Sequence, residues 1–317
     1  MHSVSTVEPK GLMRIGKYQL VKLIKSGDVT EVYEAIEDGV DAPVAIKLLR
    51  PSQNKLPLVV KRFRREAMTA VSLHHDNIVP LYDIGHENGT HFYVMKRIRG
   101  LSLGEIRKML TSDTMVNDSN LMKFLKQFQE LDFVLDKAKQ ILKALSYAHE
   151  QGIVHRDLKP SNLMIDYKGK AWISDFGTVK LTEGIAENLT TTGCKLGNFR
   201  YASPELICAD EEECGAVDNR SDLYSFAAVF FDFFTGQVPS RKTSEFSQEL
   251  CAGTIAEFPE SIHAILSRAG HPDADKRFQS ADELKRALAS YDSFSSGQQK
   301  PSLIMVLLGR FTKGMGS

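Results

Sequence analysis

The sequence lacks an excess of charge of either sign, and it has no apolar run long enough to cross a membrane. Its 317 residues contain 40 Lys+Arg and 40 Asp+Glu, so the formal net charge is +0. A dedicated nucleic-acid binder normally has a basic excess, so we expect no nucleic-acid partner. The longest apolar run, LIMVLL at residues 303–308, is far shorter than the roughly 20 residues that a spanning helix needs. We therefore expect no transmembrane segment.

Paired cysteines and a secretory leader are also missing. The four cysteines show no C-x-x-C spacing; they are Cys194, Cys208, Cys214 and Cys251. This spacing favours free thiols in a reducing compartment. The N-terminal stretch MHSVSTVEPKGLMRIGK has no apolar core of a signal peptide, so we expect a cytoplasmic protein. The run at 303–308 then either packs against the domain or a partner, or lies on a membrane surface as an amphipathic anchor.

The patterns that are present predict an α+β protein with two lobes, the first at about residues 17–97. Residues 1–16 carry no pattern and are expected to form a flexible lead-in. Short runs rich in β-branched and aromatic residues predict a small antiparallel sheet, at 17–24, 31–36, 43–49, 78–85 and 90–98. Residues 58–73 predict one prominent helix with an apolar stripe of Phe63, Glu66, Ala70 and Leu73. Glu66 requires a partner there, because a buried carboxylate is costly unless it is paired.

From Ser102 onward the pattern becomes helical and predicts a larger, mostly helical second lobe at about residues 101–290. Apolar residues at helical spacing indicate one helix that ends near Gly152; they are Val134, Ala138, Ile141, Leu145 and Ala148. The stretch DLYSFAAVFFDFF at 222–234 is apolar on nearly every side, which predicts a helix buried in a core. Residues 111–130 predict a surface insertion that contains a helix, and residues 291–317 predict a C-terminal tail.

The stretch HRDLKPSN at residues 155–162 combines a carboxylate, a lysine and an asparagine, which suits phosphoryl transfer. Asp157 can orient a hydroxyl and accept its proton, and Lys159 can neutralise charge on the transferred phosphoryl group. Asn162 offers an oxygen to a hard cation such as Mg²⁺. A short hairpin with its turn at 166–169 returns the chain to SDFG at 174–177, where Asp175 supplies a second carboxylate for the metal ion.

These motifs, in this order, resemble those of the eukaryotic-type protein kinases. The resemblance covers about residues 18–290, and it implies the bilobal fold of that family. VAIK at 44–47 matches a strand motif of the family, which makes Lys47 the implied partner of the α- and β-phosphates of ATP. Glu66 then becomes the implied ion-pair partner of Lys47, which explains a carboxylate on an apolar stripe.

The resemblance extends through the second half of the chain. SPE at 203–205 matches the motif that closes the activation segment, and DLYSFAA at 222–228 resembles the buried-helix motif with Ala227 in place of a glycine. Arg277 is implied to pair with Glu205. The implied catalytic residues are Asp157, Lys159, Lys47 and Glu66, and the implied ligands of Mg²⁺ are Asn162 and Asp175. ATP is implied to bind between the lobes against Ile24, Gly27, Val32, Ala45, Lys47, Met95, Ile98 and Met164.

The type of acceptor follows from the same resemblance. A lysine two positions after the catalytic aspartate marks Ser/Thr kinases, so Lys159 implies Ser or Thr acceptors in protein substrates. Arg156 can pair with a phosphate on the activation segment. Thr190 and Thr192 lie where bacterial-type relatives carry a pair of activating threonines, so they are candidate phosphorylation sites; the alternative is that they are unmodified loop residues.

Two departures from the family pattern leave alternatives open. The loop KLIKSGDVTEVYEA at 22–35 keeps Gly27 of the usual three glycines, with Lys25 and Thr30 at the other two positions. Asn198 stands where Ser/Thr kinases usually have a threonine. We expect an active, ATP- and Mg²⁺-dependent Ser/Thr protein kinase that phosphorylates its own activation segment. The alternatives are a pseudokinase that binds nucleotide weakly or not at all, and a kinase-fold enzyme that acts on a small molecule.

We predict that Asp28→Ser tightens ATP binding. A carboxylate about 6 Å from a phosphate charge is repelled by roughly 1–3 kcal/mol at effective dielectric constants of about 20–80. Removing that repulsion would strengthen binding by about one to two decades. Calorimetric titration of both proteins with ATP measures the change. An unchanged affinity would show that the Asp28 carboxylate already faces solvent.

Overall fold

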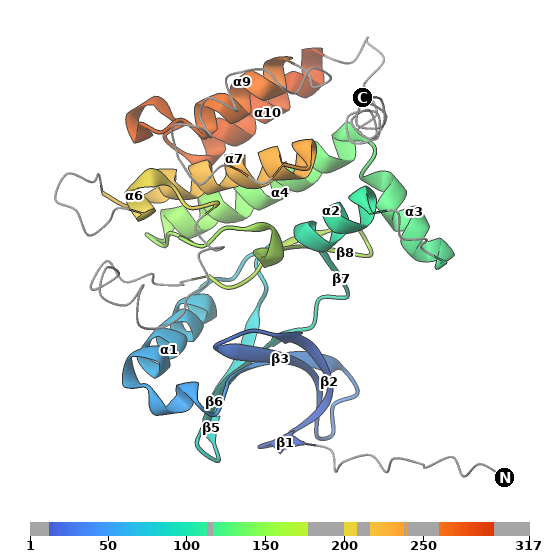
Figure 1. Ribbon diagram of the computed structural model, residues 1–317, viewed down its shortest axis with the longest axis vertical. Coiled ribbons are helices and arrows are strands. Elements are labelled where there is room, and N and C mark those ends of the chain that lie inside the picture. Colours follow the sequence, from blue (N-terminus) through green and yellow to red (C-terminus); the bar gives the residue numbers. More distant parts are fainter. Residues whose placement is uncertain are drawn as a thin grey trace, which may run out of the picture. The chain divides into compact units, whose positions relative to one another are not determined.

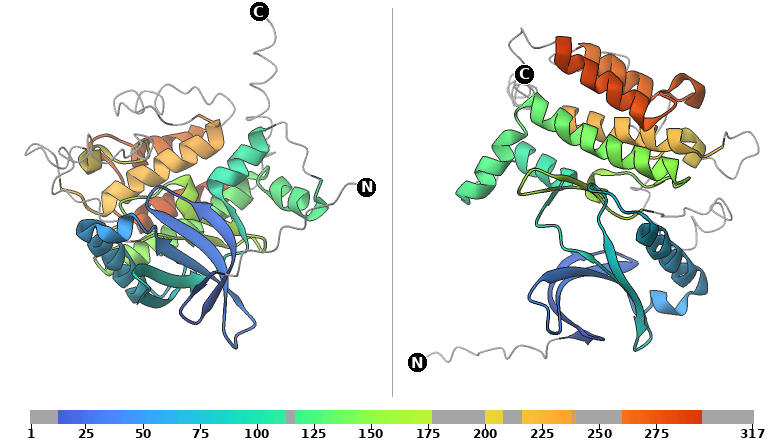
Figure 2. Two further views of the ribbon diagram at one scale, coloured as in Figure 1. Left: turned by 60° about the horizontal axis from the view of Figure 1, so that its bottom comes forward. Right: turned by 180° about the vertical axis from the view of Figure 1, so that it is seen from behind.

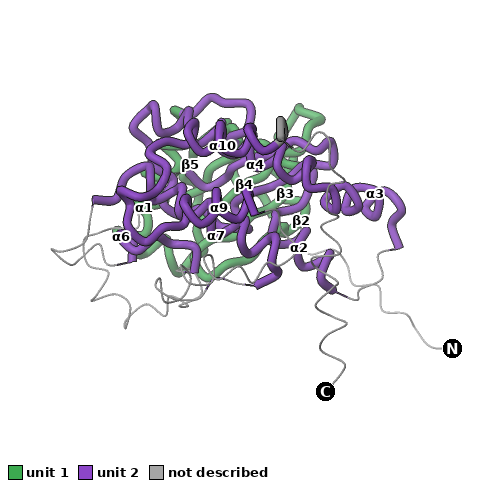
Figure 3. The backbone as a smooth tube through the Cα atoms, turned by 90° about the horizontal axis from the view of Figure 1, so that it is seen from above, with its two compact units in different colours: residues 1–72, 79–98 green, residues 73–78, 99–317 purple. Residues whose placement is uncertain are grey.

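The structure is a computed structural model, and it describes residues 13–112, 117–176, 200–207, 216–237, 239 and 260–294. The chain divides into two compact units, which Figure 3 shows in different colours. The first unit contains residues 1–72 and 79–98, and the second contains residues 73–78 and 99–317. These units correspond to the two lobes that the sequence predicts.

The first unit is built on an antiparallel sheet (Figure 1). Within the described residues this sheet has six strands in the order β1-β2-β3-β4-β6-β5. The strands are β1 (Arg14–Ile15), β2 (Tyr18–Ser26), β3 (Thr30–Glu37), β4 (Pro43–Leu49), β5 (Leu81–Glu87) and β6 (Thr90–Lys96). Asn88 and Gly89 join β5 to β6 with φ values of 49° and 75°, as a tight two-residue hairpin requires. All five strands that the sequence predicts are present.

The two faces of this sheet bury different sets of side chains. Val44, Ile46 and Leu48 alternate along β4 and form one core cluster with residues of the neighbouring strands. The opposite face carries Ala45 and Lys47, because successive side chains of a strand point to opposite sides. Helix α1 (Pro57–Ser72) joins a separate cluster in which the ring of Phe63 stacks on Tyr93 at 5.0 Å.

Two details of the first unit correct the sequence-based expectations. The lead-in was expected to run through residue 16, but β1 pairs with β2 at Arg14 and Ile15. Gly16 permits this turn because its φ of 55° is a conformation that other residues rarely adopt. On α1, Ala67 is fully buried whereas Ala70 is only partly buried, so the buried stripe is shifted from the one predicted.

The second unit is mostly helical (Figures 1 and 2). Its helices are α2 (Leu103–Thr111), α3 (Ser119–Gln127), α4 (Leu131–Glu150), α6 (Pro204–Ile207), α7 (Asn219–Thr235), α9 (Glu260–Ala269) and α10 (Ala281–Phe294). A small sheet in the order β7-β8-β9 consists of β7 (Gly100–Ser102), β8 (Leu163–Asp166) and β9 (Ala171–Ile173). A capping box fixes the start of α2, because Ser102 and Glu105 satisfy each other's backbone N–H groups.

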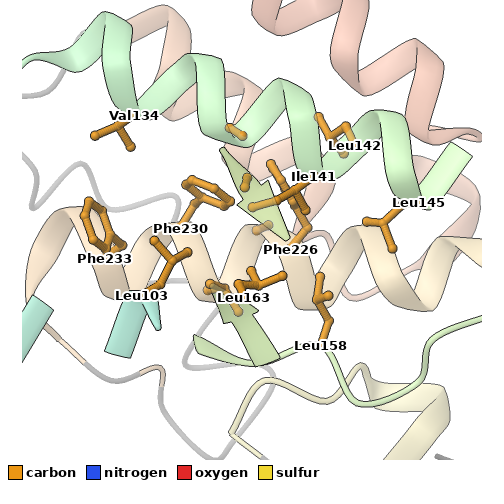
Figure 4. Packing of buried hydrophobic residues seen from close by; sticks show 14 of the residues in the cluster. Leu103, Val134, Ile141, Leu142, Leu145, Leu158, Leu163, Phe226, Phe230 and Phe233 are labelled. Carbon is orange, nitrogen blue, oxygen red and sulfur yellow. The ribbon is translucent and has the colours of Figure 1, made fainter. Parts of the chain in front are cut away.

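Helices α4 and α7 provide the centre of the core of the second unit. Figure 4 shows Phe226 and Phe230 of α7 among Ile141 and Leu145 of α4 and Leu163 of β8. The side chains of α7 are buried on all sides from residue 221 to residue 235, as its uniformly apolar sequence predicts. Replacing one such phenylalanine with alanine typically costs about 3–5 kcal/mol, so the packing of α7 contributes strongly to the stability of the second unit.

The boundaries expected in the second unit also need correction. Helix α10 continues to Phe294, so the expected tail cannot begin at residue 291. The predicted helix in the insertion is present as α3, but Phe124 and Phe128 are 4% and 1% exposed and belong to the main core cluster. The insertion is therefore partly integrated into the core. No helix among the described residues is long and apolar enough to span a membrane.

Candidate active site

The loop that follows α4 brings three predicted site residues together. Lys159 Nζ lies 2.5 Å from Asp157 Oδ2, and the Asn162 side-chain amide donates to the Asp157 backbone carbonyl at 2.9 Å. Asn162 Nδ2 also lies 3.3 Å from Asp157 Oδ2. The Asp157 side chain is 9% exposed, so these contacts with Lys159 and Asn162 hold its orientation. The loop thus presents one carboxylate in a fixed position beside one ammonium group.

The β8–β9 hairpin returns Asp175 to this loop, as the sequence predicts. The backbone N–H of Ser174 donates to the Asn162 carbonyl at 3.0 Å. His155 Nε2 donates to the Ser174 carbonyl at 2.9 Å, since a carbonyl can only accept, and His155 Nδ1 accepts from the Asp157 N–H at 3.2 Å. The imidazole of His155 therefore ties the two segments together, a role that the sequence reasoning did not identify.

Two residues of this region have strained backbone conformations. Arg156 has a φ of 64° and Asp175 a φ of 61°. Left-handed conformations are uncommon outside glycine and persist only where the surroundings enforce them, often at functional sites. The Arg156 N–H donates to Asp222 Oδ1 at 2.9 Å, and the carbonyl of Ser174, next to Asp175, accepts from His155.

Asn162 and Asp175 fit the hard cation that the sequence predicts. The Asn162 Nδ2 donates to Asp157, so its Oδ1 is the atom that can act as a ligand. Amide and carboxylate oxygens are the ligands that Mg²⁺ prefers. No group of three or more His, Cys, Asp or Glu side chains in the described part of the chain could hold a metal ion.

In the first unit, the predicted pairing of Lys47 with Glu66 is confirmed. Lys47 Nζ lies 2.7 Å from Glu66 Oε1, and the two side chains are 11% and 12% exposed. The Tyr93 hydroxyl donates to the same carboxylate oxygen at 2.7 Å. A desolvated carboxylate requires such partners, and Tyr93 is one that the sequence reasoning missed.

The sheet register places the predicted ATP-binding residues of β3, β4 and β6 on one face. Val32 pairs with Lys47, and Ala45 pairs with Met95. Directly paired residues lie on the same face of a sheet, and Ala45 and Lys47 share a face because they are two residues apart. Val32, Ala45, Lys47 and Met95 therefore form one surface.

The remaining predicted ATP-binding residues lie outside this surface of the sheet. Ile24 is 40% exposed and falls at an irregularity in the pairing of β2 with β3. Ile98 follows β6 and is 4% exposed. Met164 lies on β8 and so belongs to the second unit. Each unit thus carries part of the predicted set.

The loop between β2 and β3 is a closed turn supported by an arginine. The Gly27 N–H donates to the Thr30 carbonyl at 2.9 Å. Arg50 Nε donates to the Gly27 carbonyl at 2.6 Å, and Arg50 also bonds Ser26. Asp28 is exposed. Arg50 stabilises a loop that lacks two of the expected glycines, and its contribution was not foreseen from the sequence.

Comparison with known protein families gives one match over most of the chain. The family described as the protein kinase domain matches residues 18–286. The chain belongs to this family. The resemblance stated from the motifs is thereby confirmed.

Individual relatives agree with this assignment. The serine/threonine-protein kinase PrkC of Bacillus subtilis is 31% identical over 279 residues, which cover 85% of this chain and 40% of that protein. The serine/threonine-protein kinase PknD of Mycobacterium tuberculosis is 29% identical over 320 residues, or 96% of this chain and 44% of that protein. The kinase domain thus spans less than half the length of these curated relatives.

Solved structures support the fold. A crystal structure of the Mycobacterium tuberculosis PknI kinase domain matches with a TM-score of 0.62 at 22% identity and covers 90% of this chain and 100% of that one. At this level of identity the match concerns the fold, and it confirms the predicted antiparallel-sheet lobe and helical lobe.

The loop at residues 155–162, called the catalytic loop below, is attached to the core of this kinase domain by Asp222 of α7. Its carboxylate accepts from the backbone N–H groups of His155 and Arg156 at 2.8 and 2.9 Å, and His149 Nε2 lies 2.8 Å from it. Burial acts to raise the pKa of Asp222, but the bond from His149 and the neighbouring histidines hold the pKa below its usual value. The sequence reasoning assigned this residue only to a buried helix.

The end of the activation segment is attached to the kinase domain by an equally buried pair. Arg277 donates to both carboxylate oxygens of Glu205, at 2.7 and 2.9 Å, which confirms the predicted pairing. Ser221 adds a third bond to Glu205 at 2.7 Å. Burial acts to raise the pKa of Glu205, but the hydrogen bonds and charge of Arg277 lower the pKa overall.

Some predicted features lie outside the described residues. They are the candidate phosphorylation sites Thr190 and Thr192, Asn198, the apolar run at 303–308 and the four cysteines.

We predict that Glu205→Gln destabilises the domain by about 3–5 kcal/mol at neutral pH, because it leaves the buried charge of Arg277 unpaired. The folded pKa of Glu205 is below the unfolded value. Its ionised form therefore stabilises the fold above the unfolded pKa of about 4.3, and this contribution is lost as the pH falls through the folded pKa. Urea unfolding at pH 7 and at pH values below 4.3 measures the difference between variant and wild type.

Asp275→Asn is a matched control, because the Asp275 side chain is 87% exposed in its pair with Arg220, and such pairs contribute about 0–1 kcal/mol. A Glu205→Gln effect no larger than this control, or one that does not shrink in acid, would contradict the assignment.

Proposed function

We propose that this domain is a Ser/Thr protein kinase that transfers the γ-phosphoryl group of ATP to Ser or Thr hydroxyls of protein substrates. The observation that carries the proposal is the fixed geometry of Asp157 beside Lys159, with a separation of 2.5 Å. Membership of the protein kinase family and the names of the curated relatives support it.

In this proposal Asp157 orients the acceptor hydroxyl and accepts its proton. Lys159 and Asn162 contact Oδ2 of its carboxylate at 2.5 and 3.3 Å, and the Asn162 amide also donates to the backbone carbonyl of the same residue. The acceptor hydroxyl and the phosphoryl group meet beside Asp157 in this proposal. The ammonium group of Lys159, which contacts Asp157, would therefore neutralise charge that develops on the phosphoryl group during transfer. A positioned base of this kind typically contributes about 10²–10⁴-fold to a rate.

The remaining residues hold the nucleotide. Lys47, fixed by Glu66, would bind the α- and β-phosphates. Mg²⁺, held by Asn162 and Asp175, would neutralise charge on the phosphate oxygens. Gly27 would approach the phosphates from the loop that Arg50 supports. The adenine would contact the set predicted from the sequence: Ile24, Val32, Ala45, Met95, Ile98 and Met164.

The structural features favour turnover over a pseudokinase. Lys47, Glu66, Asp157 and Lys159 are present and paired as the chemistry requires. The loop at Gly27 is supported by Arg50 despite its missing glycines. We further propose that the kinase phosphorylates itself at Thr190 or Thr192 in its activation segment.

We predict that Asp157→Asn lowers phosphoryl transfer by about 10²–10⁴-fold, because the amide cannot accept the proton of the acceptor hydroxyl. Transfer of label from ATP in the presence of Mg²⁺ to a Ser/Thr-containing protein measures the rate. Asp275→Asn, which changes an exposed carboxylate far from the loop in sequence, should retain wild-type activity. Equal labelling by wild type and Asp157→Asn would contradict the proposal.

We predict that the purified domain gains phosphate at Thr190 or Thr192 when it is incubated with ATP and Mg²⁺. Intact-mass measurement should show added phosphates in the wild type and none in Asp157→Asn. The double variant Thr190→Ala/Thr192→Ala should lose the added mass. Phosphate that persists in this double variant would place the modification elsewhere and contradict the site assignment.

A further inference from the structure

Helix α1 (Pro57–Ser72) has more net positive charge than any other helix of the described residues. Its charged residues are Lys61, Arg62, Arg64, Arg65 and Glu66. The formal net charge of the whole chain is +0. Positive charge is therefore concentrated on this one element of the first unit.

None of these four cations has an ion-pair partner in the described part of the chain. Glu66, the one carboxylate of α1, is occupied by Lys47 at 2.7 Å. Lys61 and Arg65 are four residues apart, a spacing at which like charges on a helix repel each other. The arrangement costs stability in the isolated domain, and an anionic partner would remove that cost.

The cations point outward from the first unit. Four exposed residues follow each other at intervals of three, four and three residues, which places them along one side of the helix. They are Leu58, Lys61, Arg65 and Met68. Phe63, on the opposite side of α1, is buried in the core cluster that joins the helix to the sheet. The charged side is thus open to a partner.

Large apolar side chains are exposed among these cations. Leu58 is 59% and Met68 64% exposed, the two highest values for large apolar residues in the described part of the chain. They are ten residues apart, or about 15 Å along the helix axis, with the cations between them. We call this surface the α1 face. It consists of Leu58, Lys61, Arg62, Arg64, Arg65 and Met68.

This combination of side chains indicates the chemistry of the partner. The cations require negative charge, and Leu58 and Met68 require an apolar layer directly beneath that charge. A bilayer with anionic phospholipids has both, because charged headgroups lie above the hydrocarbon. Peptides are typically bound in a groove or at a sheet edge, whereas the α1 face is the outward side of one helix. The charge and the shape therefore favour a membrane surface.

We propose that the α1 face binds the surface of a bilayer that contains anionic phospholipids. The four cations contact the charged headgroups, and Leu58 and Met68 insert at the boundary of the acyl chains. Glu66 lies on the buried side of α1 and keeps its bond with Lys47. The membrane site thus uses different side chains from the proposed nucleotide site, and it does not depend on phosphoryl transfer.

The test is sedimentation of the full chain with lipid vesicles. Vesicles of equal parts phosphatidylserine and phosphatidylcholine should bind the protein at about 0.05 M salt, and binding should weaken at about 0.5 M because salt screens exposed charges. Vesicles of phosphatidylcholine alone should bind it at least about tenfold more weakly. Equal binding to both kinds of vesicle, or no binding to either, would overturn the proposal.

Arg62→Gln/Arg65→Gln should weaken binding to the phosphatidylserine vesicles by about 25-fold, since each Lys or Arg near an anionic surface contributes about fivefold. Lys123→Gln/Lys126→Gln is the matched control, because it removes two exposed cations from α3 in the second unit. This control should bind as the wild type does. Equal effects of the two double variants would overturn the proposal.

Leu58→Ser/Met68→Ser keeps every charge and tests the insertion of apolar side chains. It should weaken vesicle binding by about tenfold or more, because burial of a Leu or Met side chain is worth about that factor. Unchanged vesicle binding would overturn the proposal. Tight binding of poly-L-glutamate by the same variant would then identify an acidic protein as the partner instead.

Tryptophan fluorescence gives an independent readout of the orientation. The chain has one tryptophan, Trp172, which is 5% exposed. Vesicles whose phosphatidylserine carries brominated acyl chains should quench the added fluorescence of Leu58→Trp. They should not quench that of Met122→Trp, which places the probe on α3. Equal quenching of the two variants, or quenching of Met122→Trp alone, would overturn the proposal.

Discussion

The buried carboxylate of Asp222 holds the catalytic loop in place, and the rest of the site depends on that attachment. It accepts bonds from two consecutive backbone N–H groups and from the His149 ring. These bonds sustain the left-handed conformation of Arg156, which would otherwise be disfavoured. Asp222 lies on α7, whose side chains are buried on all sides. Its bonds therefore attach the loop directly to the core of the second unit. Asp157 is oriented by this chain of contacts.

The same physical constraint recurs at two other places. Glu66 and Glu205 are carboxylates with little exposure, and each is compensated by a cation and a hydroxyl group. Burial of a charge is tolerable only with such partners, and removing one partner leaves an uncompensated charge. Each pair therefore joins segments distant in sequence: β4 to α1, and the end of the activation segment to the chain before α10. The buried ion pairs hold these distant segments together.

Much of the site could be predicted because its residues stand close together in the sequence. Asp157, Lys159 and Asn162 share one loop, and the length of the hairpin places Asp175 beside them. Glu66 could be assigned to Lys47 only through the family resemblance, supported by its position on an apolar stripe. Tyr93, Arg50 and His155 could not be assigned, because a tyrosine in a strand or an arginine after one has many uses. The strand Arg14–Ile15 was missed because two residues carry no periodicity.

The sequence by itself determined the family and the two lobes, and it predicted the residues that carry the chemistry, because motif order and hydrophobic periodicity are local properties. The tertiary structure decided which groups hold those residues in position. In the sequence, Asp222 is only a polar residue at the start of an apolar helix. The fold shows that it bonds the catalytic loop. Contacts between distant segments depend on packing, which local sequence patterns do not encode.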